Sequence, residues 1–413
     1  MALTKVITGV TDLNQAQSTN GLKFPTGSVF AGTPEEGMIR NDQSQSSETS
    51  SSTMQFYNGT AWKNFVNKNP IPLGSDNFNT VLYTGNSSTQ AITGVGFAPD
   101  FVWIKRRNSA EDHALYDSVR GTNEQLSSNT TAAQATNSSP YLGLTSFDSD
   151  GFTSGNNGGT NRSPNTYVAW SWKAGGAAVS NTDGTITSQV SANVDAGFSV
   201  VKYTGNGNTS RQSYGHGLSS APELLINKNI DTATQGTNSW VVGGTLLGNG
   251  GYIFLNSTSA KNTASSYNGN KVPDSEVIYT SGTSDLVGNQ NGINFITYAF
   301  HSVAGYSKIG SYTGNGSSTG PVVDTGFEPA WVMIKSSSSD DGGGGAWLIY
   351  DNKRSTSNPR NKRLYANYNY AELTSSSYDL DFLSNGFQPK SGTSSYGFNT
   401  LGVEYIYMAF AAT

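Results

Sequence analysis

The segment Tyr-Thr-Gly-Asn occurs three times in this chain, at Tyr83–Asn86, Tyr203–Asn206 and Tyr312–Asn315. Each copy is followed by a proline and an apolar run that ends in lysine, at Pro99–Lys105, Pro222–Lys228 and Pro329–Lys335. Each copy also closes with an aromatic segment, at Tyr167–Trp172, Phe295–Phe300 and Tyr405–Phe410. Copies spaced by about 110 to 120 residues indicate duplicated domains, because solenoid repeats are only about 20 to 50 residues long.

Strand signals dominate each copy. Short apolar runs and period-two alternation recur between Gly, Asn, Asp and Pro, and no segment shows several turns of helical apolar spacing. This pattern predicts an all-β fold of three tandem antiparallel β-sandwich modules. The predicted modules are residues 77–175, 185–303 and 306–413, here called modules 1, 2 and 3. The connectors are short, so we expect the modules to stack in a row, with Ile186–Phe198 starting module 2 as an edge strand.

Residues 1–72 lie outside the repeat. Strands are predicted at Gly37–Arg40 and at Met54–Lys63, and Asn58-Gly59 is a strong signal for a hairpin turn in the second. The Ser-rich tract Asp42–Thr53 is predicted to be a flexible loop. Such a segment has few core residues, so we expect it to need partner chains for its order and to serve in oligomerisation.

Composition restricts the possible functions. Charged residues make up only 13% of the 413 residues, whereas the chain has 48 Gly, 21 Tyr, 18 Phe and 7 Trp, which predicts polar loops around aromatic cores. A net charge of −5 disfavours nucleic acid as the main partner. With no cysteine and three histidines, disulfides and Cys-ligated zinc are excluded, and no metal or cofactor is expected. No apolar stretch predicts a signal peptide or membrane insertion, so synthesis in a cytoplasm is expected.

Several longer strings carry a family resemblance. They are Phe97–Lys105, Leu115–Asp117, Phe147–Phe152, Tyr167–Gly176, Asn181–Ser188 and Gly305–Asn315. These strings resemble a module repeated in tail-fibre and receptor-binding proteins of tailed bacteriophages, particularly marine and cyanobacterial ones. The resemblance extends over residues 77–413, and Met54–Lys63 separately resembles a small hairpin unit near the start of phage fibre proteins.

The resemblance implies a fold and a function. The fold would be a lectin-like sandwich of the concanavalin A or SPRY type. The protein would be part of the virion, a homotrimeric tail fibre that attaches to a host cell-surface glycan or lipopolysaccharide. Its N-terminal segment would bind other tail or adaptor proteins. An alternative in the same particle is a head-decorating or collar fibre without a receptor role.

Module 2 departs from the pattern. It has Val241-Val242 where the other modules have Leu115–Asp117 and Ile349–Asp351, and it has no string like Phe382–Phe387. A binding role shared by all three modules is therefore not expected.

Aromatic side chains are the first candidates for ligand contact, because a flat ring can stack on a sugar. Those in strand-like strings, at Trp103, Trp170, Trp172 and Trp331, are predicted to be core. Those in polar, Gly- or Asn-rich surroundings are better candidates, although they could instead cap their own sandwich: Tyr141, Trp240, Tyr267, Tyr368 and Tyr370.

Basic residues are the second candidates. Charge is densest from Asp351 to Arg363, where Arg354 and Arg363 could contact acidic glycans or phosphates. A solvated loop or a subunit contact is the alternative. Module 3 is predicted to lie farthest from the N-terminal anchor and to carry the ligand contact. The predicted site residues are therefore Arg354, Arg363, Tyr368, Tyr370 and Trp240.

Catalysis is a third and disfavoured possibility. A polysaccharide depolymerase would need two carboxylates about 5 to 10 Å apart. Candidate pairs are Glu111 with Asp117 and Asp148 with Asp150, but 29 acidic residues supply many pairs by chance. No nucleophile, zinc-protease or phosphate-loop motif occurs. No catalytic residue is therefore predicted.

Overall fold

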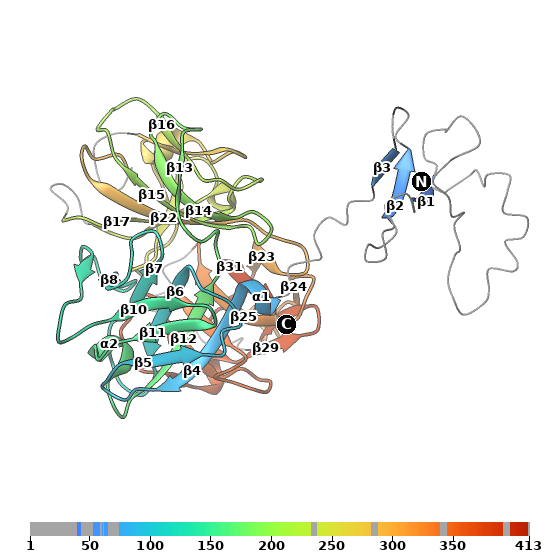
Figure 1. The fold of residues 1–413 in the computed structure, drawn as a ribbon. Coiled ribbons are helices and arrows are strands. Elements are labelled where there is room, and N and C mark those ends of the chain that lie inside the picture. Colours follow the sequence, from blue (N-terminus) through green and yellow to red (C-terminus); the bar gives the residue numbers. More distant parts are fainter. Residues whose placement is uncertain are drawn as a thin grey trace, which may run out of the picture. The chain divides into compact units, whose positions relative to one another are not determined.

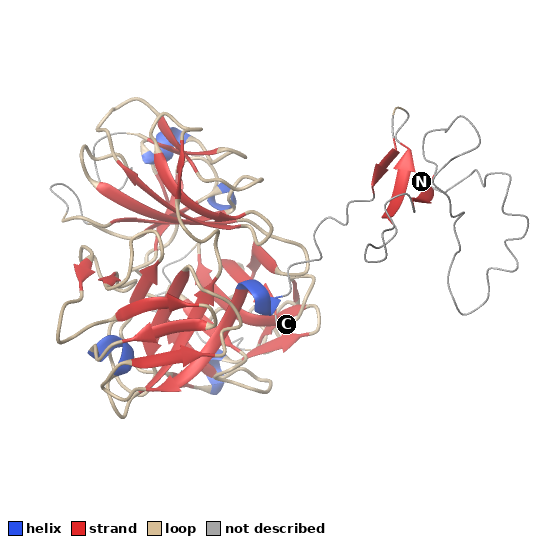
Figure 2. Ribbon diagram, viewed as in Figure 1, coloured by secondary structure: helices blue, strands red, loops and turns tan. Residues whose placement is uncertain are grey.

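The computed structural model describes residues 39–42, 53–57, 60, 62–64, 74–232, 238–281, 288–338, 345–390 and 397–411. The chain divides into two compact units, Met1–Pro70 and Ile71–Thr413. The fold is all-β, as predicted, and every strand ladder in the described part is antiparallel (Figures 1 and 2).

The N-terminal unit contains one three-stranded sheet, in the order β1 (Ile39–Asp42), β2 (Thr53–Tyr57), β3 (Trp62–Asn64). Strands β2 and β3 pair with Tyr57 opposite Trp62, which confirms the predicted hairpin. Most of the Ser-rich tract lies outside the described residues.

Module 1 is a sandwich of two sheets. The large sheet has the order β4 (Phe78–Thr84), β12 (Thr166–Trp172), β6 (Phe101–Arg106), β7 (Ala114–Asp117). The small sheet has the order β10 (Leu144–Asp148), β11 (Gly151–Ser154), β5 (Gln90–Thr93). Short elements complete the module: α1 (Gly74–Asn77), α2 (Gly158–Asn161), and the pair β8 (Glu124–Gln125) and β9 (Ala135–Thr136).

Module 2 has the longest sheet and the smallest cover. The large sheet runs β13 (Val179–Asn181), β14 (Ser188–Asn193), β15 (Phe198–Thr204), β22 (Asn294–Phe300), β17 (Leu224–Asn229), β18 (Val241–Gly243), β19 (Gly251–Phe254), β20 (Asn262–Thr263). The cover is β16 (Gln212–Gly215) with β21 (Val277–Thr280), accompanied by the 3₁₀ turns η2 (Thr245–Leu247) and η3 (Tyr267–Asn270). The expectation of an edge strand at Ile186–Phe198 is wrong, because β13 pairs with the outer edge of β14.

Module 3 repeats the plan of module 1. Its large sheet runs β23 (Ser307–Thr313), β31 (Glu404–Ala411), β25 (Pro329–Ser336), β26 (Leu348–Asp351), β27 (Lys362–Tyr365), β28 (Leu373–Thr374). Its small sheet runs β24 (Val323–Asp324), β30 (Gly386–Pro389), β29 (Leu380–Leu383), next to η6 (Ser376–Tyr378). In all three modules the aromatic strand pairs with the Tyr-Thr-Gly-Asn strand on one side and the Pro-to-Lys strand on the other.

The aromatic strands are buried on both faces. In β12, Tyr167 and Ala169 face the small sheet of their own module, whereas Val168, Trp170 and Trp172 face outward, since strand side chains alternate. The outward sets of β12, β22 and β31 meet in one apolar core, here called the central cluster. Trp170 is therefore buried as predicted, but it lies, like Phe410, between modules and not inside one sandwich.

The central cluster changes the predicted arrangement. Ring centroids of Phe101 and Tyr298, from modules 1 and 2, lie 4.2 Å apart, and those of Phe78 and Phe410, from modules 1 and 3, lie 5.0 Å apart. Phe300 of module 2 also meets Phe410. The prediction that the modules stack in a row is wrong. Large sheets that are apolar on both faces need a second cover, and each finds it in the other two modules.

The repeated Tyr-Thr-Gly-Asn segment is structural. Each of its asparagines exchanges hydrogen bonds with a buried asparagine that precedes the aromatic strand, in the pairs Asn86–Asn161, Asn206–Asn289 and Asn315–Asn399. Each tyrosine hydroxyl donates to a carbonyl in the same loop, those of Thr160, Gly288 and Phe398. A Cβ on Gly314 would lie 2.2 Å from the Thr400 oxygen, so only glycine allows this approach.

The ends of the larger unit meet. A Cβ on Gly74, in α1, would lie 2.8 Å from the carbonyl oxygen of Ala411, the last residue of β31. The last strand of module 3 therefore ends beside α1, the first element of the larger unit.

Candidate functional site

The three modules contact one another in a cyclic order. Trp240 of module 2 donates its indole N–H to Ser127 O of module 1 (2.9 Å), and Trp347 of module 3 donates to Phe254 O of module 2 (3.0 Å). His113 of module 1 occupies the equivalent position and contacts Tyr365 O of module 3 through Nε2 (2.8 Å). The three contacts close a ring, because the modules follow one another as if around a threefold axis.

The proton of His113 is fixed by its neighbours. Its Nδ1 accepts from Trp103 Nε1 at 2.7 Å, so Nε2 carries the proton that it donates to Tyr365 O. Burial, with help from the Lys105 ammonium, lowers the pKa of His113 to about 3. The imidazole is therefore neutral and serves as a structural donor.

Trp240 is not a ligand platform. Its side chain is 0% exposed, in the central cluster, so the prediction of an accessible loop aromatic is wrong. Module 1 accepts its indole N–H through Ser127 O.

Arg354 is also interior. It is 2% exposed, and its Nε pairs with Asp351, which also accepts from the indole N–H of Trp170 (3.0 Å) of module 1. Asp117 and Arg120 form the same pair in module 1, where Asp117 accepts from the hydroxyl of Tyr298 (2.8 Å). The prediction that Arg354 contacts a ligand is therefore wrong: this arginine neutralises a carboxylate that holds two modules together.

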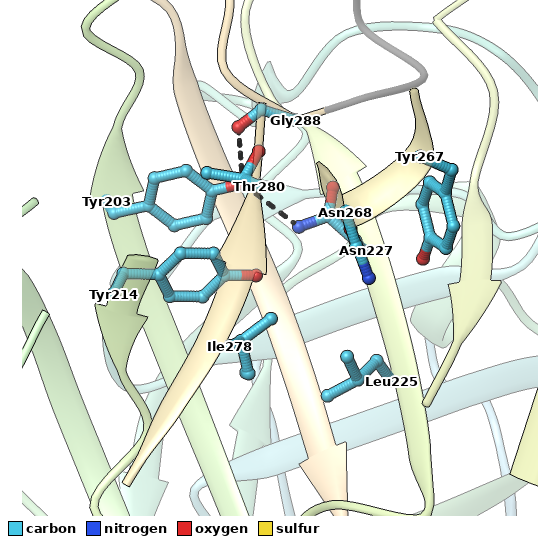
Figure 3. A pocket seen from close by; sticks show the side chains of 9 residues that line it. All are labelled: Tyr203, Tyr214, Leu225, Asn227, Tyr267, Asn268, Ile278, Thr280 and Gly288. Atoms are coloured by element: carbon cyan, nitrogen blue, oxygen red, sulfur yellow. Dashed lines mark hydrogen bonds between the residues drawn. The ribbon is translucent and has the colours of Figure 1, made fainter. Parts of the chain in front are cut away.

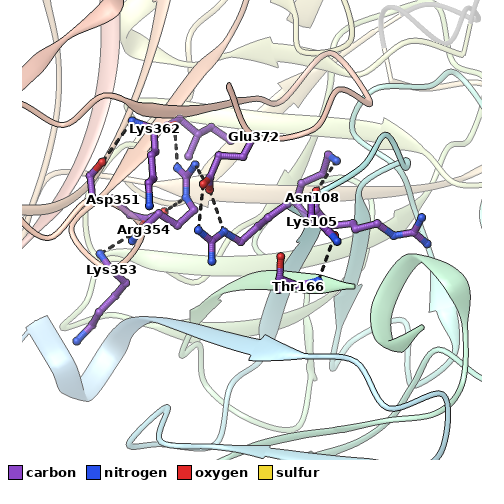
Figure 4. A network of polar contacts seen from close by, with 12 residues as sticks. Lys105, Asn108, Thr166, Asp351, Lys353, Arg354, Lys362 and Glu372 are labelled. Atoms are coloured by element: carbon purple, nitrogen blue, oxygen red, sulfur yellow. Dashed lines mark hydrogen bonds and ion pairs between the residues drawn. The ribbon is translucent and has the colours of Figure 1, made fainter. Parts of the chain in front are cut away.

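The interface of modules 1 and 3 has further polar links (Figure 4). Arg107 binds both carboxylate oxygens of Glu372, at 2.9 and 3.0 Å, and Arg354 approaches the same carboxylate at 3.4 Å. Nearby, Lys105 is buried and donates to Arg106 O (2.8 Å). Burial lowers the pKa of Lys105 to about 8. Lys228 and Lys335 make the same contact with the next residue, so the lysine of the repeated string is structural.

Tyr368 and Tyr370, two of the predicted site residues, form a stacked pair that reaches the surface through Tyr370. Their rings stack with centroids 4.7 Å apart and an interplanar angle of 12°, and Tyr370 is 49% exposed. Tyr365 meets both rings edge-on. The loop is fixed by module 1, since Tyr368 O contacts His113 Nε2 and Asn369 O accepts from Glu111 N.

The sister modules have no such pair. Strand register places Ser257 and Ser259 of module 2, and Thr130 and Ala132 of module 1, at the positions of Tyr368 and Tyr370. The tyrosines are therefore not needed by the repeated architecture. Below them, Arg363 is 7% exposed, donates Nε to Tyr365 OH (2.6 Å) and covers the Tyr378 ring at 4.0 Å. Arg363 thus supports the platform from within the protein.

The other loop aromatics lie elsewhere. Tyr141 is 66% exposed on module 1, whereas Tyr267 is buried in module 2. Sequence patterns missed the polar residues Asn227 and Thr297 inside module 2, which hydrogen-bond to each other. The signal that could have found them is the departure of module 2 from its sisters.

The carboxylates considered for catalysis have structural partners. Asp117 pairs with Arg120, Glu111 pairs with Arg106, and Asp148 accepts from the hydroxyl of Thr153. Asp150 accepts from two backbone N–H groups, those of Gly96 and Gly94, which hold the pKa of this exposed carboxyl below its usual range. A glycosidase acid needs a raised pKa. Within the described ranges, no three His, Asp or Glu residues gather as metal ligands.

Comparison with known proteins assigns a family on residues 73–413. The chain belongs to the DUF7483 family. This family is a domain of unknown function, and its match spans all three modules. No curated protein and no solved structure matches the chain. Among the described helices, none combines the length and apolar character that crossing a bilayer requires.

Proposed function

We propose that this chain is a structural protein of a tailed-phage particle, a tail fibre that attaches to a host-surface glycan through the tyrosine pair Tyr368–Tyr370. The observation that carries the proposal is this stacked pair, in which Tyr370 is exposed and Tyr368 is half-buried; module 1 holds the pair in place, and neither sister module has it. The resemblance of residues 77–413 to phage fibre modules supports the particle and the role.

The geometry of the pair suits a sugar. Tyrosines offer a large, rigid contact area at little cost in conformational entropy, and a site that is already ordered avoids the cost of ordering on binding. The facing sides of the two stacked rings cover each other, so the flat apolar face that can pack on the C–H face of a saccharide is the outer side of the exposed Tyr370 ring. Loops on rigid sandwiches are also where such folds place recognition.

The surrounding charges favour a neutral saccharide. Arg107, Arg354 and Glu372 form one buried or half-buried network, and Arg106 pairs with Glu111. Charges that neutralise one another attract an acidic sugar weakly. Binding is therefore expected to depend little on salt, unlike binding through unpaired arginines.

Adsorption of purified full-length protein to host cells tests the proposal. Tyr368→Ala combined with Tyr370→Ala should reduce adsorption by about tenfold or more, because central aromatic anchors dominate binding energy. Tyr141→Ala is the matched control, since Tyr141 is an exposed tyrosine outside the pair. Unchanged adsorption of the folded double variant would favour the head-decorating or collar fibre.

The proposal includes a homotrimer that is held by the N-terminal segment and attached through it to other tail or adaptor proteins. Its support is the small number of core residues that the sequence of this segment predicts, together with the resemblance. Light scattering of the full chain should give three chains per particle. A stable monomer at micromolar concentration would contradict this part of the proposal and leave the tyrosine site untouched.

A further inference from the structure

Module 2 contains a small polar cavity between its two sheets, which is partly open to the outside (Figure 3). The cavity has about 10 Å³ of free room, which is close to what one water molecule or one hydroxyl group needs. Its polar lining consists of Tyr203, Tyr214, Asn227, Tyr267, Asn268 and Thr280. Some of these groups have polar counterparts, since Tyr83 and Tyr312 stand at the position of Tyr203 and Ser154 stands at that of Thr280, but others replace apolar residues of modules 1 and 3.

Strand register shows which residues changed. Asn227 stands where modules 1 and 3 have Ile104 and Ile334, as the neighbouring repeated lysines show. Across the layer, the pair Tyr214–Ile278 replaces two apolar pairs, Ile92–Phe152 and Val323–Phe387. Module 2 has thus exchanged aliphatic side chains for a hydroxyl and a carboxamide, and phenylalanine for a smaller residue.

These polar groups form a connected network. Asn227 Nδ2 donates to Thr297 Oγ1 (2.7 Å), which also contacts the Tyr214 hydroxyl (3.1 Å). The Tyr203 hydroxyl donates to Gly288 O (2.7 Å). Burial raises the pKa of Tyr214 to about 12, so this phenol keeps its proton at neutral pH. The network is ordered and uncharged.

The part of module 2 beside the cavity also differs from the corresponding parts of modules 1 and 3. The small sheets of modules 1 and 3 each have a third strand, β10 and β29. The small sheet in the described part of module 2 has no counterpart of this strand. Gly243 replaces the buried tyrosines Tyr116 and Tyr350, and a Cβ there would lie 2.2 Å from the Tyr267 hydroxyl. Tyr267 therefore enters the space that those tyrosines fill in the sisters.

The turn that delivers Tyr267 has an uncommon backbone. Asn268 has a φ of 51° and Asn270 a φ of 57°, in the left-handed region that costs most residues about 1 kcal/mol or more. Asparagine tolerates this region better than most side chains. The turn places the Asn268 side chain at the cavity, where an alanine would be both strained and apolar.

We propose that this cavity is a binding site for one hydroxyl or hydroxymethyl group of a neutral saccharide, whose ring remains outside. Phenols, carboxamides and a threonine can each both donate and accept hydrogen bonds, as a hydroxyl requires. The described lining contains no Asp, Glu, Lys, Arg or His, so a charged group would be buried without a partner. The site lies in module 2 and is independent of the tyrosine pair in module 3.

Saturation-transfer NMR on the full chain tests this site with glucose, galactose, mannose and N-acetylglucosamine as probes, and glucuronic acid as the charged probe. The main variant combines Asn227→Ile, Tyr214→Ile and Thr297→Ala, which are the residues of module 1. We expect it to fold and to bind the best neutral probe at least about tenfold more weakly. Asn268→Gly, which the positive φ accepts, is a milder second variant and should also weaken binding.

The double variant Tyr368→Ala with Tyr370→Ala is the control, because it leaves the cavity intact. Retained binding in this control and loss in the module 2 variants would support the cavity. Binding that is unchanged in the module 2 variants would overturn the proposal, as would a cavity that holds only an ordered water in crystals soaked with each sugar. Loss in the control alone would place saccharide binding at the tyrosine pair and also overturn it.

Discussion

Among the described residues, the interface between modules 2 and 3 lacks a buried carboxylate contact that the other two interfaces have, and it lacks both the acceptor and the donor of that contact. Module 1 offers Asp117 to Tyr298 of module 2, and module 3 offers Asp351 to Trp170 of module 1. At the equivalent positions of the third interface, module 2 has Gly244 and module 3 has Met408. Acceptor and donor are absent together. A buried carboxylate without its partners is costly, so such a group persists only as a complete set.

The three interfaces also differ in chain connectivity. Modules 1 and 2, and modules 2 and 3, are joined by the chain, whereas modules 1 and 3 meet without a covalent link. Their interface has the Asp351–Trp170 contact, the His113–Tyr365 contact and the two-pronged Arg107–Glu372 ion pair. Among the described interfaces, the most extensive polar contacts thus lie between modules 1 and 3, which no connector joins.

Removing a buried charge should have the largest effect. Asp351→Ala leaves buried Arg354 with only its longer contact to Glu372 and Trp170 without its acceptor, so we expect a loss of about 3 to 5 kcal/mol in the free energy of unfolding. Urea unfolding of the full chain measures it. Glu276→Ala, at an exposed carboxylate, is the control and should change stability by less than about 0.5 kcal/mol. A loss below about 1 kcal/mol for Asp351→Ala would show that the ring does not depend on this pair.

Substitution at one equivalent position in each module sharpens the comparison. Trp170→Phe and Tyr298→Phe each remove a donor from a buried carboxylate and should cost about 1 to 3 kcal/mol. Met408→Leu removes no hydrogen bond and should cost less than about 1.5 kcal/mol. The same unfolding experiment ranks them. If Met408→Leu proved as costly as the other two, packing and not the polar contact would distinguish the interfaces.

The third effect depends on pH. The folded-state pKa of His113, about 3, lies below the unfolded value of about 6.5, so the unfolded chain takes up the proton first. The contribution of His113 to stability is complete above pH 6.5 and declines as the pH falls toward 3. Between pH 6.5 and 5.5 the loss should be about 1 kcal/mol.

His113→Gln provides the comparison for this pH effect, because glutamine can donate and accept at the same place without titrating. The variant should show a shallower decline of the urea midpoint over that pH range. Equal declines in both proteins would mean that other groups account for the pH dependence.

The smallest effect on stability is expected outside the contacts that join the three modules. Tyr370→Ala truncates a half-exposed ring at a position where module 2 has Ser259, so it should change the free energy of unfolding by less than about 0.5 kcal/mol. Thermal or urea unfolding measures this. A loss above about 2 kcal/mol would make Tyr370 part of the interface and remove it as a surface ligand contact.

Local patterns predicted the parts of the fold that depend on local chemistry. The Asn58-Gly59 signal gave the β2–β3 hairpin, and the repeated strings gave three modules with equivalent strands. The central cluster was not predictable in the same way. A strand such as Phe101–Arg106, buried along its whole length, shows that both faces are covered but not which element covers the second face.

For the candidate site residues too, the local sequence did not predict which side chains are exposed. Tyr370 lies in polar sequence and is exposed, whereas Trp240 lies in polar sequence and is buried, because its cover comes from a module more than 100 residues away. A better signal was present in the repeat. Trp240 and Trp347 precede equivalent strands, and the backbone N–H of each donates to an asparagine side-chain oxygen, that of Asn256 or Asn367. Residues with such counterparts are structural, so those without counterparts are the better candidates for function.

The proximity of Gly74 to Ala411 gives the larger unit a property of its own. A polypeptide that enters and leaves a domain at one place can be spliced into the surface turn of another protein without forcing that turn apart. The same proximity allows circular permutation, with the two ends joined and a new opening in the connector between modules 1 and 2. The three modules thus form a self-contained cassette, which recombination could move between unrelated carrier proteins as one piece.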